Sequence, residues 1–224
     1  MLHIRLAGAD VALHPLGGAY LPQHHALLIA DAHFGKAVSF RRLGVPVPRG
    51  TTSETLSQLS ALVSATGARR IVFLGDFLHS ARAHAPATLA AIARWRAQHA
   101  ALQLTLVRGN HDDRAGDPPA ALAIDVVDEP LPLGPFALCH HPRPVAGAYV
   151  LAGHWHPCVH LGGRANDRLR LPCFWLGDES MAAQAVGILP AFGSFTGMHG
   201  IDRRAGDRVF AIADGTVRAV PQPP

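Results

Sequence analysis

The stretch Ile71-Val72-Phe73-Leu74-Gly75-Asp76 is the clearest guide to how this chain folds, because four apolar residues are followed at once by a glycine and a carboxylate. A short apolar run that ends at a turn signal is typical of a strand buried on both faces. Four further runs have the same form and also end on polar residues: 27–30, 102–107, 136–139 and 149–152. The sequence therefore predicts buried strands whose ends carry chemically active side chains.

Two helices are predicted between the first three of these strands. Thr51-x-x-Glu54 resembles a capping box, and apolar residues then recur at helical spacing until Gly67. Pro86 stands where a first-turn proline would, and a second apolar stripe runs from it toward His99. Strands that alternate with helices indicate a largely parallel sheet, and such sheets bind ligands at the carboxyl ends of their strands.

The carboxyl-terminal part, from about residue 168 to residue 220, has a different pattern. Its apolar runs are closely spaced, and Asp214-Gly215 is a turn signal between the last two. We therefore predict antiparallel sheet there, after a motif-bearing part that covers about residues 26–157. We expect a single domain, 1–224, because two halves of a chain this long would bury proportionally less surface.

The composition excludes a disordered chain and gives no sign of a membrane span. Hydrophobic residues make up 49% and charged residues 16%, and no apolar stretch approaches the roughly 20 residues that a span needs. The amino terminus lacks the layout of a signal peptide, so we expect a cytoplasmic protein. The 3 cysteines have no Cys-x-x-Cys spacing and are interpreted as reduced thiols. The net charge of +4 favours an anionic partner only weakly, because the excess comes from an arginine-rich composition.

The polar residues at the strand ends are carboxylates, imidazoles and one amide. Asp31 and His33 have i, i+2 spacing, as have His154 and His156, and in an extended segment this spacing projects both side chains to the same side. With the single residues at the other strand ends they form one set of candidate metal ligands: Asp31, His33, Asp76, Asn110, His140, His154 and His156.

Ligands of these types suit Mn²⁺, Fe or Zn²⁺ better than a thiolate-based structural zinc site. The set is too large for one ion, so two divalent ions are predicted, with Mn²⁺ preferred. Two metals about 3.5–4 Å apart can hold a bridging hydroxide and neutralise the oxygens of a phosphorus centre during in-line attack. The pattern therefore indicates hydrolysis of a phosphoester.

In this order, Asp-x-His, Gly-Asp, Gly-Asn-His-Asp, His and Gly-His-x-His resemble the motifs of the calcineurin-like metallophosphoesterase superfamily over about residues 26–157. The resemblance implies a four-layer α/β/β/α sandwich with two mixed β-sheets. It also implies which residues share each metal: Asp31, His33, Asp76 and His156 on one, and Asp76, Asn110, His140 and His154 on the other, so that Asp76 bridges.

The same resemblance implies roles for neighbouring residues. The hydroxide between the metals would be the nucleophile, and His111 would contact the scissile phosphate and protonate the leaving oxygen, with Asp112 orienting its ring. Arg108 would neutralise phosphate charge. His140 and His141 compete for one ligand position, because both follow a predicted strand and pleating sends adjacent side chains to opposite faces. We prefer His140, since the ligand of the superfamily commonly comes first after the strand.

Three longer stretches narrow the resemblance to the bacterial ligase-associated DNA damage response endonucleases: residues 75–80, 139–142 and 189–197. That family implies a DNA substrate, a role in DNA repair and a functional association with a DNA ligase and a helicase. The loop around Lys36, Arg41 and Arg42 is similar to that family as well, and these cations would hold a nucleic-acid backbone unless they form an ordinary solvated face.

Several alternatives stay open at this point. His79 either lines the site or is structural, and Trp155, between two candidate ligands, either stacks on a base or packs beside the site. The same metal pair would also serve a phosphatase or phosphodiesterase of nucleotides or other small phosphate esters. A catalytically silent DNA-repair scaffold is the third hypothesis, and the sequence makes no prediction of the oligomeric state.

Overall fold

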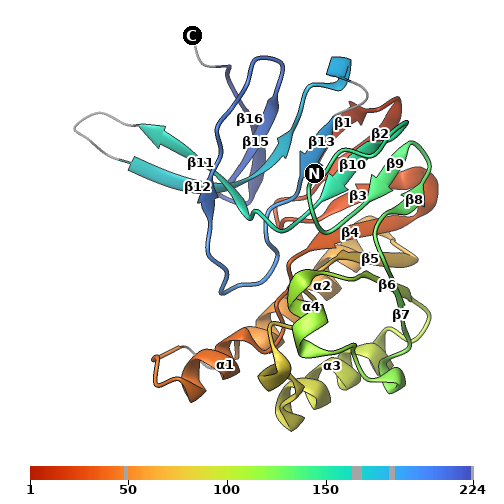
Figure 1. Ribbon diagram of the computed structural model, residues 1–224, viewed down its shortest axis with the longest axis vertical. Helices are drawn as coiled ribbons and strands as arrows, with labels where there is room; N and C mark the ends of the chain where they lie inside the picture. Colours follow the sequence, from red (N-terminus) through yellow and green to blue (C-terminus); the bar gives the residue numbers. More distant parts are fainter. Residues whose placement is uncertain (48–49, 163–167, 182–184, 223–224) are drawn as a thin grey trace.

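The computed structural model describes residues 1–47, 50–162, 168–181 and 185–222, and its amino-terminal half is built around one mixed sheet (Figure 1). The strands of this first sheet follow chain order: β1 (Leu2–Leu6), β2 (Ala9–Leu13), β3 (Ala19–Leu21), β4 (Ala26–Ala30), β5 (Arg70–Leu74), β6 (Gln103–Val107) and β7 (Ile124–Val127). Strands β1 to β4 pair antiparallel, and β4 to β7 pair parallel. The parallel part confirms the predicted α/β pattern.

The helices come from the connections of this sheet. The described α-helices are α1 (Lys36–Arg42), α2 (Thr51–Thr66), α3 (Pro86–Gln98) and α4 (Asn110–Ala115), and the described 3-10 helices are η1 (Pro22–His24), η2 (Ala81–His84), η3 (Ala120–Leu122) and η5 (Glu179–Met181). Leu59 of α2 and Trp95 of α3 pack on the face of the sheet that carries Leu27, Ile71 and Phe73. Helices α2 and α3 are therefore the two predicted crossovers.

The capping box predicted at Thr51 is wrong. Gly50 is the N-cap of α2, with φ 90°, and among the described residues no side chain makes a capping hydrogen bond there. Thr51 is already helical, and its carbonyl accepts a hydrogen bond from Thr55 Oγ1 at 2.9 Å. The helix therefore starts on a glycine that adopts left-handed backbone, a conformation which a threonine would enter only with strain.

The second sheet uses the rest of the chain. Its strands are β8 (Leu131–Leu133), β9 (Phe136–Leu138), β10 (Tyr149–Ala152), β11 (Pro157–Gly162), β12 (Arg168–Leu176), β13 (Val186–Ile188), β14 (His199–Gly200), β15 (Arg208–Ala213) and β16 (Thr216–Val220). Strands β9, β10 and β13 are parallel, whereas β12, β15 and β16 pair antiparallel. Asp214 and Gly215 turn the last hairpin with φ of 49° and 65°, which confirms the predicted antiparallel end.

The two mixed sheets pack face to face, which confirms the predicted sandwich. Leu28 and Val72 of the first sheet lie in one core with Phe136, Leu151 and Phe174 of the second. Of the two helical layers that the resemblance implied, the described residues form the one on the first sheet (Figure 1). The outer face of the second sheet is covered in part by the loop between β9 and β10. None of the described helices has the length and apolar character to span a bilayer.

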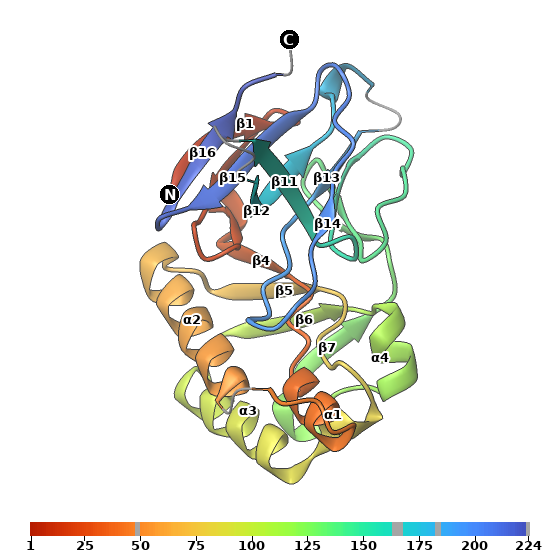
Figure 2. The same ribbon diagram turned by 90° about the vertical axis from the view of Figure 1, so that its left-hand side faces the viewer.

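One segment of the second half returns to the first sheet. Figure 2 shows the chain between β13 and β14 running down from the second sheet to the first. There Phe192 N–H donates to Ala30 O at 2.9 Å, and Gly193 N–H donates to Asp31 O at 3.2 Å. This return joins the carboxyl end of β4 to residues 189–197, so both sheets contribute to the edge where the polar motifs gather.

Candidate metal centre

The five polar motifs lie where they were predicted, at the carboxyl ends of β4, β5, β6, β9 and β10. Their glycines let the segments approach one another. A Cβ added to Gly75 would lie 2.1 Å from His140 Nδ1, and one added to Gly153 would lie 2.5 Å from Asp31 Oδ2. Real Cβ atoms do not approach other atoms this closely, so any larger residue would force the candidate ligands apart.

The backbone is strained at the candidate ligands themselves. Positive φ angles occur at five of them: Asp31 (52°), His33 (45°), Asp76 (49°), His154 (70°) and His156 (47°). Left-handed backbone costs a non-glycine residue roughly 1–2 kcal/mol, and such strain is found at sites where the surrounding structure fixes side chains for function. At these residues the left-handed backbone turns the side chains toward the cluster, whereas regular strand backbone would point them elsewhere.

One group of side chains gathers around Asp31. His156 Nε2 lies 3.6 Å from Asp31 Oδ1, and His33 Nε2 lies 3.4 Å from His156 Nε2 and 3.7 Å from Asp76 Oδ2. Asp31, His33 and Asp76 are buried, and burial lowers the pKa of His33, so its imidazole is neutral and offers a lone pair. These four side chains can share one cation.

A second group gathers around His140, whose ring is buried. His140 Nε2 lies 2.9 Å from Asn110 Oδ1, 3.0 Å from His154 Nδ1 and 3.4 Å from Asp76 Oδ1. Burial, reinforced by His140, lowers the pKa of His154 to about 4. Asp76 belongs to both groups, with one carboxylate oxygen toward each.

The donor set fits divalent cations. Asp31 Oδ1 is buried and has no hydrogen-bond partner among the described residues, although two imidazoles lie near it. Two nitrogen atoms that face each other at 3.0 or 3.4 Å can share only one proton, whereas a cation can use both lone pairs. Burial raises the pKa of Asp76, because removal from water disfavours the charged carboxylate, and a nearby cation would favour it.

Backbone carbonyls fix the tautomers of two of these histidines. His140 Nδ1 donates to Leu74 O and His156 Nδ1 donates to Gly197 O, each at 3.1 Å. Their Nε2 atoms are therefore left with lone pairs, as metal-binding histidines require. Such backbone contacts leave no signature in a sequence, and our sequence reasoning missed them.

His140 and His141 have different surroundings. The ring of His140 lies in the second group, whereas His141 Nδ1 lies 2.9 Å from Glu129 Oε1. Glu129 also accepts the backbone N–H groups of both histidines, at 2.8 and 2.9 Å. Nothing in the sequence singled out Glu129, which accepts both backbone N–H groups while the two rings point in different directions.

His111 stands at the edge of the cluster, and its orienting partner is not the predicted one. His111 Nδ1 donates to His79 O at 2.6 Å, and its Nε2 lies 4.0 Å from Asp76 Oδ2. The role predicted for Asp112 is wrong, because its two oxygens accept the N–H groups of Leu78 (3.1 Å) and Gly109 (3.0 Å). Asp112 therefore caps α4, and burial raises its pKa to about 6.

The predicted substrate contact Arg108 lies beside two carboxylates. Its guanidinium forms ion pairs with Asp117 at 3.0 Å and with Asp128, and the hydrogen bond to Asp117 raises its pKa. These ion pairs are solvent-exposed, and a contact of Arg108 with phosphate stays a prediction.

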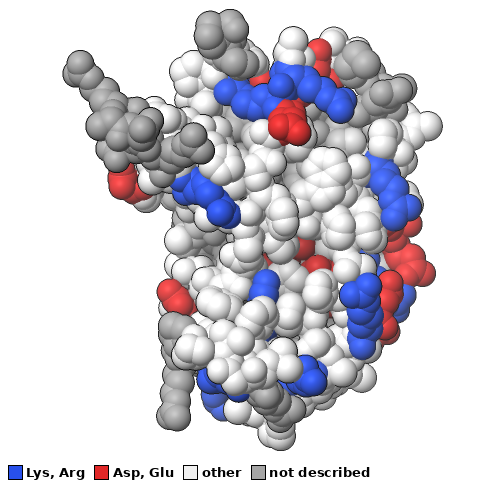
Figure 3. Space-filling model, turned by 60° about the vertical axis from the view of Figure 1, so that its left-hand side comes forward, with Lys and Arg blue, Asp and Glu red and all other residues white. Residues whose placement is uncertain are grey.

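The three other predicted substrate contacts lie on α1. Lys36 is half-buried, and burial lowers its pKa while Asp31 and Asp76 act in the opposite direction. Lys36 lines a pocket beside His33, with Thr51, Ser194 and other residues: Ala32, Phe34, Gly35, Ala37, Thr52, Thr55, Gly193, Phe195 and Thr196. Arg41 is exposed and donates to Val47 O at 3.4 Å, and the side chain of Arg42 lies outside the described residues. Figure 3 shows Lys and Arg side chains in separate groups on the face presented, not in one patch.

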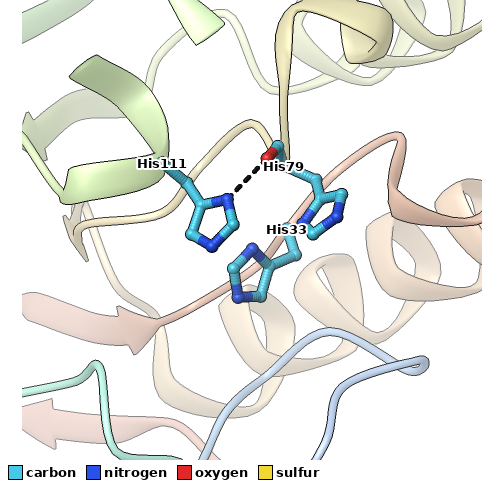
Figure 4. A group of neighbouring side chains, drawn as sticks. All are labelled: His33, His79 and His111. Carbon is cyan, nitrogen blue, oxygen red and sulfur yellow. Dashed lines mark hydrogen bonds between the residues drawn. The ribbon is translucent and has the colours of Figure 1, made fainter. Parts of the chain in front are cut away.

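The open alternatives for His79 and Trp155 are resolved in part. The ring of His79 lies beside those of His33 and His111, so it lines the cluster (Figure 4). Trp155 is 46% exposed, and its ring lies 5.8 Å from that of Trp175. It packs on a neighbour at the surface and still presents an open face.

A crystal structure of the Pseudomonas putida nuclease MPE is similar to the whole chain. It has 43% sequence identity and a TM-score of 0.84, over 98% of this chain and 99% of that one. Together with the clustered histidines and aspartates, this likeness defines the class of protein: a metal-dependent hydrolase of phosphoester bonds. The chain belongs to the calcineurin-like metallophosphoesterase superfamily, in the family of this nuclease, as its motifs indicated.

Two other similar structures do not strengthen the family assignment. YfcE, a phosphoesterase from E. coli, is 14% identical over 87% of this chain and 97% of its own, and AQ665 from Aquifex aeolicus, of unknown function, is 19% identical over 63% and 81%. Both have TM-scores of 0.40, which is too low to support the assignment. No protein-family model matches the chain, and no curated protein matches it.

Proposed function

We propose that the chain is an endonuclease of cytoplasmic DNA repair that hydrolyses phosphodiester bonds with two divalent cations, Mn²⁺ in the first place. The observation that carries this proposal is the buried carboxylate of Asp76, whose oxygens lie 3.7 Å from His33 Nε2 and 3.4 Å from His140 Nε2. Cations on its two sides would activate water and neutralise the charge on phosphate oxygens.

The proposed ligands divide into two sets that share Asp76. They are Asp31, His33, Asp76 and His156 for one cation, and Asp76, Asn110, His140 and His154 for the other. Imidazole and carboxylate ligands with one amide suit Mn²⁺, Fe or Zn²⁺. The resemblance to the superfamily supports these sets, and the short distances among their donor atoms agree with them.

His111 is the proposed general acid. Its Nδ1–H is held by the carbonyl of His79, so the proton of an imidazolium would be donated from Nε2, the atom that faces Asp76. An imidazole can supply a proton near neutral pH to the oxygen that leaves the phosphorus centre. The side chain is 30% exposed, which lets a substrate reach it.

Lys36 is the proposed contact to the nucleic-acid backbone. It lines the pocket next to His33 with the hydroxyl-bearing residues Thr51, Ser194 and Thr196, and this combination suits a phosphate group. Arg41 and Arg42 follow on the same helix and would extend the contact. The nuclease named for the similar structure supports DNA over a small ester, and the motif resemblance supports association with a DNA ligase and a helicase.

The test is hydrolysis by the purified chain with added Mn²⁺ and four substrates: bis(p-nitrophenyl) phosphate, its monoester, single-stranded DNA and double-stranded DNA. Asp76→Asn and His111→Ala should both abolish DNA cleavage, but only Asp76→Asn should impair Mn²⁺ loading. Turnover of the monoester alone would replace the proposal by a small-molecule phosphatase. Absence of turnover with Mn²⁺, Fe or Zn²⁺ would leave the scaffold hypothesis.

A further inference from the structure

Trp155 follows one candidate metal ligand in the chain, His154, and precedes another, His156, and its side chain is exposed. Its exposed fraction is 46%, whereas Trp95, in the core under the first sheet, is 5% exposed and donates its indole N–H to Ser60 Oγ at 2.9 Å. A tryptophan that serves packing alone is buried as Trp95 is. Trp155 instead leaves a large apolar surface in water directly beside the metal centre, where a ligand could cover it.

A second tryptophan supports the exposed ring. The ring centroids of Trp155 and Trp175 are 5.8 Å apart, with an interplanar angle of 31°. Trp175 is itself anchored, because its indole N–H donates to Asp207 Oδ2 at 2.8 Å, and the same oxygen accepts the backbone N–H of Arg204 at 2.9 Å. Asp207 is buried. The ring of Trp155 is therefore restricted before any ligand binds, and a preorganised ring loses less conformational entropy when a ligand stacks on it.

The exposed aromatic rings of the described residues gather at the metal centre. Two of the exposed large apolar side chains are aromatic, and they are Trp155 and Phe195. Phe195 belongs to the return segment and lines the pocket beside His33 that also holds Lys36. Both rings therefore border a site at which the proposed substrate places a phosphate. Proteins that bind nucleic-acid strands commonly combine cations for the phosphates with aromatic side chains on which the bases stack.

We infer that Trp155 is a base contact of this site: one side of its indole packs on Trp175, and the open side stacks on a base next to the scissile phosphate. Trp175 is a positioning residue that fixes the plane of this ring. A base inside a duplex is already stacked on both sides, so the contact is open to a base that has left the stack. The inference rests on the proposed function, since it adds a substrate contact to that same site.

Binding of two oligonucleotides measures the contact. One is single-stranded oligothymidylate, and the other is a strand of equal length whose sugars carry no bases, so both present the same phosphates. Fluorescence anisotropy with Mn²⁺ gives the two Kd values, and His111→Ala serves as the common background because it keeps the candidate ligands and should not cleave. The Kd of the strand without bases divided by the Kd of oligothymidylate is the base ratio, in which the contribution of the phosphates cancels.

We expect Trp155→Ala to lower the base ratio about 10-fold, as loss of a base–aromatic stack does, and Trp155→Phe to keep most of it. Trp175→Leu should lower the ratio by a smaller factor, because the ring of Trp155 remains but is no longer held in its plane. Two controls should leave the ratio unchanged: Leu169→Ala removes an exposed apolar side chain from β12, and His3→Phe adds an exposed ring on β1.

An unchanged base ratio in Trp155→Ala would overturn the inference, as would a lack of binding to both strands, and an unchanged ratio in Trp175→Leu would reject its positioning role. Damage to the neighbouring ligands His154 and His156 is distinguishable, because weaker Mn²⁺ binding would lower the affinity for both strands and preserve their ratio. If the wild-type chain hydrolyses no phosphodiester, the proposed function fails, while the base ratio still tests the contact at Trp155.

Discussion

At the scale of a single residue, Gly75 and Gly67 distinguish two ways in which a substitution can destabilise the protein: a steric clash and backbone strain. A Cβ at this position meets His140 Nδ1 at 2.1 Å and also has to adopt φ 76°. Gly67, at the end of α2, has φ 65° but open space around it, so Gly67→Ala introduces the backbone strain alone. We expect Gly67→Ala to lose about 1 kcal/mol of unfolding free energy and keep its Mn²⁺ affinity.

Gly75→Ala should lose more stability and, in addition, bind Mn²⁺ at least about 10-fold more weakly, because His140 has to move. Urea unfolding and Mn²⁺ titration of both variants provide the comparison. Equal Mn²⁺ affinities in the two variants would show that the motif glycine serves the turn and not the metal centre.

Asp112 gives the metal-free protein a defined pH dependence. Burial raises its pKa from 3.8 to about 6, so the folded state binds the proton more tightly than the unfolded state. The stability from this group is complete below about pH 4 and is lost as the pH rises through about 6, a difference of up to about 3 kcal/mol. Buried histidines such as His154, whose pKa is lowered, change stability in the opposite direction but equally in wild type and Asp112→Asn. Urea unfolding in chelator should therefore show the stability of wild type relative to Asp112→Asn falling by up to about 3 kcal/mol between pH 4 and pH 7; a pH-independent difference would contradict the assignment.

At the scale of elements, α1, α2 and the return segment 193–196 form the pocket that holds Lys36. If this cation contacts a DNA phosphate, Lys36→Gln should weaken DNA binding and reduce the slope of log Kd against log salt by about 1. Arg94→Gln, on an exposed position of α3, is the control and should leave the slope unchanged. Fluorescence anisotropy with Asp76→Asn as the common background avoids cleavage, and equal slopes for both variants would remove Lys36 from the binding surface.

The elements differ in how readily the sequence reveals them. Strand β4 is a continuous apolar run, β5 and β6 are mostly apolar and buried, and all three end on motifs, which makes them easy to predict. Strands β1 to β3 were missed because β1 and β2 mix apolar with polar residues and β3 is only 3 residues long. Their pairing joins them to β4 in one sheet. The left-handed backbone at Asp31 and Asp76 was equally hidden, because no local preference predicts it.

More of the metal site than of the surrounding fold could be predicted from the sequence. The order and spacing of the motifs identified the residues that converge, because each motif follows a strand and the strand ends of the two packed sheets meet at the same edge of the molecule. The contacts that the sequence did not predict, at Glu129, Asp112 and Arg108, include partners distant in sequence: His140, Leu78 and Asp128. Such partners become known only when the chain is folded.

At the scale of the whole molecule, the proposed cations would bind both sheets together. Asp76 follows β5 of the first sheet, whereas His140 and His154 follow β9 and β10 of the second. Binding to the folded state alone raises its stability by about 2.7 kcal/mol at 100 times Kd. We therefore expect Mn²⁺ to raise the Tm of the metal-free chain and chelator to reverse the rise.

Asp76→Asn should lose most of this Mn²⁺ effect on Tm, while His3→Phe should retain it. Differential scanning calorimetry at increasing Mn²⁺ concentrations measures how the Tm of each variant depends on Mn²⁺. An undiminished rise in Asp76→Asn would place the stabilising cation elsewhere in the protein.

The contact of residues 189–197 with β4 also determines when the site can form during synthesis of the chain. A ribosome makes the chain from its amino end, so Asp31, His33 and Asp76 emerge well before His156 and before Gly197, whose carbonyl holds His156. The early residues therefore wait for the return segment, and the proposed metal centre is complete only after residues 189–197 have been made and have folded back onto β4.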